Sequence, residues 1–130
     1  MKQRILVVDD EKLIRELLRH KLSALGFEVV TAKNAKEFSE CAFARKPDLI
    51  ILDIWLQNRM GPDVHHELLG AGFDGEVPVI FITALIEGEP KSGQMLPGKK
   101  YALHSKPFDF EKLVPEIHHL LNREKTKEAA

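Results

Sequence analysis

Three acidic side chains stand directly after short apolar runs, where strands of a buried sheet would end. Asp9 and Asp10 follow residues 5–8, and Asp53 follows residues 49–52. Carboxylates that lie close together repel one another unless a cation compensates their charge. Mg²⁺ takes carboxylate oxygens as ligands and keeps several waters, so these residues predict a magnesium site with open positions. A carboxylate in such a site can also attack phosphorus and form an aspartyl phosphate.

A hydroxyl and an amine follow two further candidate strands. Thr83 comes after residues 78–82, and Lys106 comes after residues 101–105. Catalysis of phosphoryl transfer consists mainly of positioning and charge stabilisation. A hydroxyl and an ammonium group can each hold one phosphoryl oxygen. Asp53 is the best candidate for the nucleophile, because it stands alone on a central strand with the other groups on either side.

These side chains can meet only if their strands are parallel. Short apolar runs alternate along the chain with longer segments in which apolar residues recur every three or four positions, as on one face of a helix. The alternation predicts an α/β fold with a parallel sheet covered by helices on both faces. In such a sheet, ligands bind at the carboxyl ends of the strands. The expected strands are residues 5–8, 27–31, 49–52, 78–82 and 101–105.

Several local sequence signals predict where the helices begin and where a regular helix is not expected to form. Asn34 and Glu37 form a capping pair for a second helix, and Gly61-Pro62 opens a third. Residues 87–98 contain two prolines and three glycines, so a regular fourth helix there would be costly and we expect a shortened helix or a loop. The last helix is expected to start near Asp109 and to bury Leu113, Ile117, Leu120 and Leu121.

Composition narrows the class of protein. The chain has 130 residues and a formal net charge of −1, which indicates one domain and favours neither nucleic acid nor an anionic membrane as a partner. A single cysteine, Cys41, excludes an internal disulfide and fits a reducing compartment. No apolar stretch is long enough to span a membrane, so we expect a cytoplasmic protein. We assign residues 1–123 to the domain and residues 124–130 to a charged C-terminal tail.

Four motifs together resemble the signatures of response-regulator receiver domains of two-component signalling, in the order of that family and at nearly its spacing. They are Val-Val-Asp-Asp-Glu at residues 7–11, Leu-Ile-Ile-Leu-Asp-Ile at 49–54, Ile-Thr-Ala at 82–84 and Ser-Lys-Pro-Phe at 105–108. The resemblance covers almost the whole chain and includes chemotaxis regulators. It implies a flavodoxin-like, doubly wound (βα)5 three-layer sandwich with strand order 2-1-3-4-5, in which the atypical helix 4 would be residues 87–98.

The resemblance also implies a role for each site residue. Asp53 would be the phosphoacceptor, with a phosphohistidine of a sensor histidine kinase or histidine phosphotransfer protein as donor. The output would be altered contact with an unknown downstream protein rather than enzymatic turnover, with no direct binding of nucleic acid and no membrane insertion. Mg²⁺, or Mn²⁺ in its place, would be held by Asp9, Asp10, Asp53 and the main-chain carbonyl of Trp55. Phosphate binding and switching would fall to Thr83, Ala84 and Lys106, and the peptide between Lys106 and Pro107 would be cis.

The chain departs from the family at positions around this site. Gln57 stands where the family usually has proline, and Leu103 stands where it usually has an aromatic switch residue, a role that Tyr101 on the same strand face could take. Trp55 and Leu85 each lie two residues after a site residue. We expect these two bulky side chains to modulate the lifetime of the phosphate by shielding it from water.

Two alternative functions remain open at this point. One is a receiver-like binding module that acts without phosphorylation. The other is a phosphatase that forms an aspartyl phosphate, although such enzymes carry a second aspartate two residues after the nucleophile, where this chain has Trp55. The neighbouring pairs His65-His66 and His118-His119 do not face each other on a helix, so we expect surface histidines rather than metal ligands.

Overall fold

The computed structural model describes residues 2–84, 101–106 and 109–129, with side chains for residues 2–83 and 109–122. Five strands form one parallel sheet in the order β2-β1-β3-β6-β7. They are β1 (Arg4–Val8), β2 (Glu28–Ala32), β3 (Leu49–Asp53), β6 (Val79–Ala84) and β7 (Tyr101–Lys106). Because β6 and β7 are the fourth and fifth strands of the expected sheet, the predicted order 2-1-3-4-5 is confirmed.

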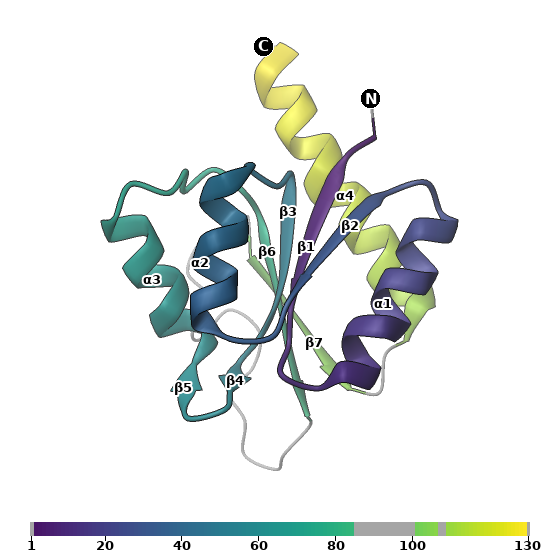
Figure 1. Cartoon of the computed structure of the whole chain (residues 1–130). Coiled ribbons are helices and arrows are strands. Elements are labelled where there is room, and N and C mark those ends of the chain that lie inside the picture. Colours follow the sequence, from purple (N-terminus) through teal and green to yellow (C-terminus); the bar gives the residue numbers. More distant parts are fainter. Residues whose placement is uncertain (1, 85–100, 107–108, 130) are drawn as a thin grey trace.

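Helices cover both faces of this sheet, which confirms the flavodoxin-like three-layer arrangement. Figure 1 shows α1 and α4 on one side of the strands and α2 and α3 on the other. The helices are α1 (Lys12–Ala24), α2 (Ala35–Ala44), α3 (Gly61–Gly70) and α4 (Phe110–Ala129). The prediction of a shortened or missing helix at residues 87–98 lies outside the described residues.

Alternating side chains of the strands divide the core into two clusters. Leu6, Ile50 and Phe81 pack toward α2 and α3, whereas Ile5, Ile51 and Ile80 pack toward α1 and α4. Successive side chains of a strand point to opposite faces, so a central strand that is covered on both faces must be apolar throughout. This is why the run before Asp53 is continuous and places that carboxylate at the end of a buried strand.

Two of the predicted helix starts are confirmed, that of α2 and that of the last helix. The Asn34 side chain accepts a hydrogen bond from the Glu37 N–H at 2.9 Å, while the Glu37 carboxylate accepts one from the Lys33 N–H at 3.0 Å. The predicted capping pair therefore exists, although the second bond goes to the residue before the cap. The last helix begins at Phe110, close to its expected start. All of its predicted core residues are buried, namely Leu113, Ile117, Leu120 and Leu121.

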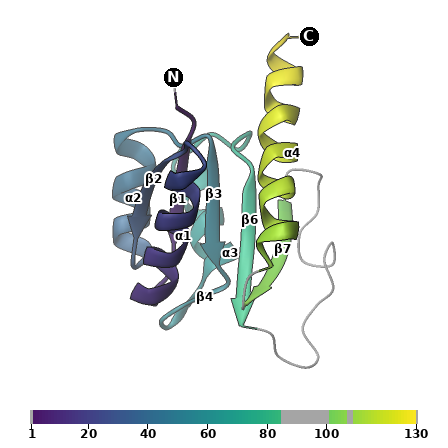
Figure 2. The ribbon, with the colours of Figure 1, turned by 90° about the vertical axis from the view of Figure 1, so that its right-hand side faces the viewer.

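A short antiparallel hairpin that the sequence patterns did not predict follows β3. It consists of β4 (Trp55–Leu56) and β5 (Arg59–Met60). Figures 1 and 2 show the hairpin at the carboxyl end of the sheet, opposite the start of β1 and the end of α4. The chain therefore passes through a turn between Asp53 and α3, right beside the expected site.

One prediction about the histidines is wrong. His65 is buried on the inner side of α3 and packs edge-on against Phe81, with ring centroids 6.5 Å apart. Its position follows from helical spacing, because His65 lies between the core residues Val64 and Leu68. His66, His118 and His119 are exposed, as expected. Among the described residues, no helix combines the length and the apolar character that a membrane span requires.

Candidate functional site

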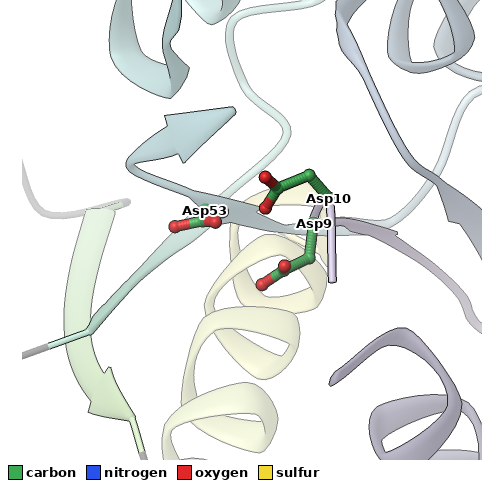
Figure 3. Close-up of side chains that lie close together, drawn as sticks. All are labelled: Asp9, Asp10 and Asp53. Carbon is green, nitrogen blue, oxygen red and sulfur yellow. The ribbon is translucent and has the colours of Figure 1, made fainter. Parts of the chain in front are cut away.

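Three carboxylates meet at the carboxyl edge of the sheet. Asp9 and Asp10 directly follow β1, and Asp53 is the last residue of β3. These strands are hydrogen-bonded neighbours, and their pairing sets Val8 beside Leu52. One carboxylate oxygen from each aspartate lies within 4.8 Å of the other two. Figure 3 shows the three side chains gathered around a common space.

Main-chain groups orient the two buried carboxylates. The Glu11 N–H donates to Asp9 Oδ1 at 2.8 Å, and the Trp55 N–H donates to Asp53 Oδ1 at 3.2 Å. Each aspartate thus bonds to the N–H two residues ahead, the arrangement of an Asx turn. The Arg15 guanidinium donates to the Asp9 carbonyl oxygen at 2.8 Å and ties the site to α1. These bonds hold Asp9 and Asp53 at the strand ends.

The arrangement suits a hard divalent cation. Asp9 and Asp53 are buried, whereas Asp10 is exposed, so the cluster combines a dry side with a side open to solvent. Three adjacent negative charges favour a cation strongly. Ligands on opposite sides of one Mg²⁺ lie about 4 Å apart, because each lies about 2.1 Å from the ion. The oxygens of this cluster all lie within 4.8 Å of one another, and carboxylate oxygens are the ligands that Mg²⁺ prefers.

Gly61 allows the hairpin to return to the site. Its N–H donates to the Ile54 carbonyl oxygen at 2.6 Å. A Cβ atom added at Gly61 would lie 2.1 Å from the Asp53 carbonyl oxygen, which is far inside van der Waals contact. Only glycine therefore permits the start of α3 to approach the main chain of Asp53 this closely.

The remaining predicted residues lie along β6 and β7. Thr83 is buried and follows Ile82, which pairs with Asp53 across the two strands. Ala84 pairs with Lys106, so both strand ends reach the carboxyl edge. Tyr101 and Leu103 pair with Val79 and Phe81 through the main chain. The side chains of residues 84–106 lie outside the described part of the chain, as do Leu85 and the Lys106–Pro107 peptide.

Sequence reasoning missed three contacts of this site, namely the Trp55 N–H to Asp53, the Glu11 N–H to Asp9 and the Arg15 guanidinium to the Asp9 carbonyl. The two Asx turns could have been predicted from the sequence, because aspartate at the end of a strand often accepts a hydrogen bond from the N–H two residues ahead. The Arg15 contact could not have been predicted, since it depends on how α1 packs against the end of β1.

Comparison with known proteins decides the family. Residues 5–118 match the family described as the response regulator receiver domain. The chain is a response regulator receiver domain. Its acidic cluster lies at the carboxyl ends of β1 and β3.

The receiver domain resembles parts of longer regulators. It is 34% identical over 130 residues to the response regulator MprA of Mycobacterium tuberculosis, covering all of this chain and 55% of that protein. It is 36% identical over 123 residues to a probable transcriptional regulator ycf27 of Cyanophora paradoxa, covering 94% of this chain and 49% of that protein. The receiver domain thus spans about half the length of these curated relatives.

Solved structures agree on the fold. The crystal structure of NtrX from Brucella abortus superposes with a TM-score of 0.84 at 32% identity, covering 99% of this chain and 29% of that chain. The chemotaxis protein CheY4 of Vibrio cholerae superposes with a TM-score of 0.80 at 25% identity, covering 92% of this chain and 99% of that one.

Proposed function

We propose that Asp53 is the phosphoacceptor of this receiver domain and takes its phosphoryl group from a phosphohistidine of a sensor histidine kinase or a histidine phosphotransfer protein. The observation that carries the proposal is the convergence of Asp9, Asp10 and Asp53 within 4.8 Å. Asp53 ends the central strand β3, with β1 and β6 on either side. It is therefore the carboxylate to which groups from both neighbouring strands have access.

The transfer is a displacement at phosphorus. A carboxylate oxygen of Asp53 forms a bond to the phosphorus atom while the P–N bond to the donor imidazole breaks, and the electron pair leaves with the imidazole nitrogen. The Trp55 N–H at 3.2 Å orients the carboxylate through Oδ1. Loss of the phosphoryl group to water regenerates the carboxylate and releases inorganic phosphate.

The acidic pair and the hairpin would hold Mg²⁺, with Mn²⁺ as the alternative ion. Asp9, Asp10 and Asp53 supply side-chain oxygens, and we assign the main-chain carbonyl of Trp55 as a further ligand. When bound, the ion would offset the negative charge that builds up as the phosphoryl group approaches three carboxylates. Without it, the charge of the cluster would oppose the approach of a phosphorylated donor.

Residues of β6 and β7 would bind the phosphoryl oxygens. We assign this role to Thr83, Ala84 and Lys106, of which Thr83 is buried near the end of β6. The strand register supports the assignment, because Ala84 pairs with Lys106 at the same sheet edge as Asp53. Trp55, Leu85, Leu103 and Tyr101 remain predicted modulators of phosphate lifetime and switching, and the cis peptide before Pro107 remains a prediction.

Phosphorylation would act as a switch rather than as catalysis on outside substrates. A phosphoryl group adds negative charge and acceptor oxygens, which would draw the Thr83 hydroxyl toward Asp53 and shift the population between two conformations. We expect the output to be a protein–protein contact in the cytoplasm, without direct nucleic-acid binding or membrane insertion.

Intact-mass spectrometry after incubation with acetyl phosphate and Mg²⁺ tests the proposal. The wild-type protein should gain the mass of one phosphoryl group, and EDTA or Asp53→Asn should abolish the gain. Asp63→Asn is the matched control, since it removes an exposed carboxylate of α3 and should leave the gain unchanged. A wild-type protein that gains no mass would favour the phosphate-independent binding module, and turnover of a chromogenic phosphate ester would favour the phosphatase.

A further inference from the structure

The exposed aspartate of the cluster, Asp10, depends on its main chain for its position. Within the described part of the chain, its carboxylate forms no hydrogen bond or ion pair with another residue, whereas Asp9 and Asp53 each accept a main-chain N–H. Figure 3 nevertheless shows the Asp10 carboxylate turned toward Asp53. The backbone dihedrals of Asp10 set the direction of its Cα–Cβ bond, and with it the space that the carboxylate can reach.

Hydrogen bonds hold the peptide groups on both sides of Asp10. In the peptide before it, the Asp9 carbonyl oxygen accepts from the Arg15 guanidinium at 2.8 Å. In the peptide after it, the Glu11 N–H donates to Asp9 Oδ1 at 2.8 Å. Because peptide groups are planar, the orientations of these two define φ and ψ of Asp10. Loss of either bond therefore loosens one of the two dihedrals that aim the Asp10 side chain.

Arg15 joins this turn to α1 in two ways. Its guanidinium bonds to the Asp9 carbonyl, and its own N–H donates to the Glu11 carbonyl oxygen at 3.1 Å. The helix is in turn fixed by Leu18 and Leu22, which are buried in the core cluster between the sheet and α4. A helix cap does not provide this link, because the N-cap residue Glu11 forms no side-chain cap hydrogen bond. Arg15 is thus a contact through which the packed helix holds the turn after β1.

The charge of Arg15 works against a cation site, and this makes its role testable. A guanidinium stays positively charged in proteins, and the bond to the Asp9 carbonyl brings it close to the acidic cluster. Coulomb repulsion from that charge would weaken the binding of another cation. Electrostatics and positioning therefore predict opposite effects when Arg15 is replaced. Loss of the charge alone would tighten Mg²⁺ binding, whereas loss of the hydrogen bond would weaken it.

We propose that Arg15 is a positioning residue of the divalent-cation site, which holds the Asp9–Asp10 peptide so that the Asp10 carboxylate can share an ion with Asp9 and Asp53. The inference rests on the proposed metal site. Arg15 contacts neither the ion nor the phosphoryl group in this proposal, and it acts through the main chain of the turn after β1. A side chain without donor groups would leave the Asp9 carbonyl to water, and the peptide before Asp10 would rotate more freely.

Mg²⁺ titrations test the proposal without measuring phosphorylation, followed by calorimetry and by the fluorescence of Trp55, the single tryptophan of the chain. Arg15→Met keeps a long unbranched side chain but removes both the donors and the charge. We expect it to bind Mg²⁺ about tenfold more weakly than wild type, at the lower end of what groups that orient metal ligands contribute. Arg15→Lys retains the charge and an N–H donor, and it should bind Mg²⁺ more tightly than Arg15→Met.

Arg19→Met is the matched control, because Arg19 is an exposed residue of the same helix and pairs with Glu16. It removes the same charge without touching the turn, and it should bind Mg²⁺ within about twofold of wild type. Gly72→Ala controls for loss of stability. Gly72 has φ = +101° and follows α3 at the end of the sheet away from the site, so its replacement should lower the melting temperature and leave Mg²⁺ affinity unchanged.

Amide hydrogen exchange of the metal-free protein gives a readout that does not involve the ion. The Glu11 N–H should exchange faster in Arg15→Met than in wild type, because its bond to Asp9 Oδ1 belongs to the same turn. In Arg19→Met it should exchange at the wild-type rate. A change confined to this turn distinguishes local loosening from unfolding, which would speed exchange in the core strands as well.

Two outcomes separate the failure of this inference from the failure of the proposed function. If Arg15→Met binds Mg²⁺ as tightly as wild type or more tightly, while Asp53→Asn weakens binding, the positioning role of Arg15 is refuted and the metal site stands. If wild type itself shows no Mg²⁺ binding that depends on Asp53, both are refuted. An equal loss of affinity in Gly72→Ala would also contradict the inference, because it would show a general effect of destabilisation.

Discussion

At the residue scale, Gly61 is where the site tolerates a side chain least. We predict that Gly61→Ala destabilises the fold by about 1–3 kcal/mol or more, since a Cβ there would overlap the Asp53 carbonyl oxygen. Gly70→Ala in the same helix should instead be neutral or stabilising by up to about 1 kcal/mol, because a Cβ at Gly70 meets nothing within 4 Å. Urea unfolding of both variants measures the contrast, and equal effects would contradict the close approach.

A second residue-scale prediction concerns pH. Burial, and to a lesser degree the neighbouring His66, lowers the pKa of His65 below its usual 6.5. Below about pH 6.5 the unfolded chain therefore binds a proton that the folded chain does not, so stability falls as the pH is lowered, by up to about 1.4 kcal/mol per pH unit. His65→Gln should reduce this slope in urea titrations between roughly pH 7 and pH 5.

The control for His65 is His119→Gln, which removes an exposed histidine of α4. It should leave the slope of stability against pH close to that of wild type. An unchanged slope in His65→Gln would show that other groups account for the loss of stability in acid.

At the element scale, α2 depends on its N-terminal cap. The Asn34 side chain satisfies the Glu37 N–H, which would otherwise lack a partner within the helix. We predict that Asn34→Ala costs about 1 kcal/mol and that Asn34→Asp retains most of the stability. Thermal unfolding followed by circular dichroism measures both. An Asn34→Ala protein as stable as wild type would mean that packing of Phe38 and Ala42 alone holds the helix.

At the scale of the whole molecule, the acidic cluster links metal binding to stability. In EDTA, Asp53→Asn should raise the melting temperature, since two charges at such a separation repel by about 1–4 kcal/mol. In Mg²⁺, wild type should gain stability, by about 2.7 kcal/mol when the ion is at a hundredfold its Kd, and Asp53→Asn should gain less. Melting curves at increasing Mg²⁺ provide the measurement. A wild-type melting temperature that does not respond to Mg²⁺ would contradict the metal site.

Much of the fold followed from local patterns in the sequence. The apolar runs before Asp9, Asp53 and Thr83 predicted buried parallel strands, because a strand covered on both faces must be apolar throughout. Asn34 and Glu37 predicted the start of α2, since capping involves only neighbouring residues. The same logic placed the three aspartates at one edge, because parallel strands all end on the same side. The strand order and the family assignment came from four motifs taken together.

Tertiary structure alone decided what depends on contacts between distant parts of the chain. His65 lies on the same face of α3 as Val64 and Leu68, but histidine is polar and we expected it at the surface; only the packing of α3 shows that its ring contacts Phe81. Nor did the residues after Asp53 predict the hairpin, since Gln57 is not a typical turn residue. In the folded chain Gln57 takes φ = +57°, Leu56 is buried in the core and Arg59 pairs with Glu67 of α3. Sequence sets which groups stand at the strand ends, whereas packing sets the separations at which they can share an ion.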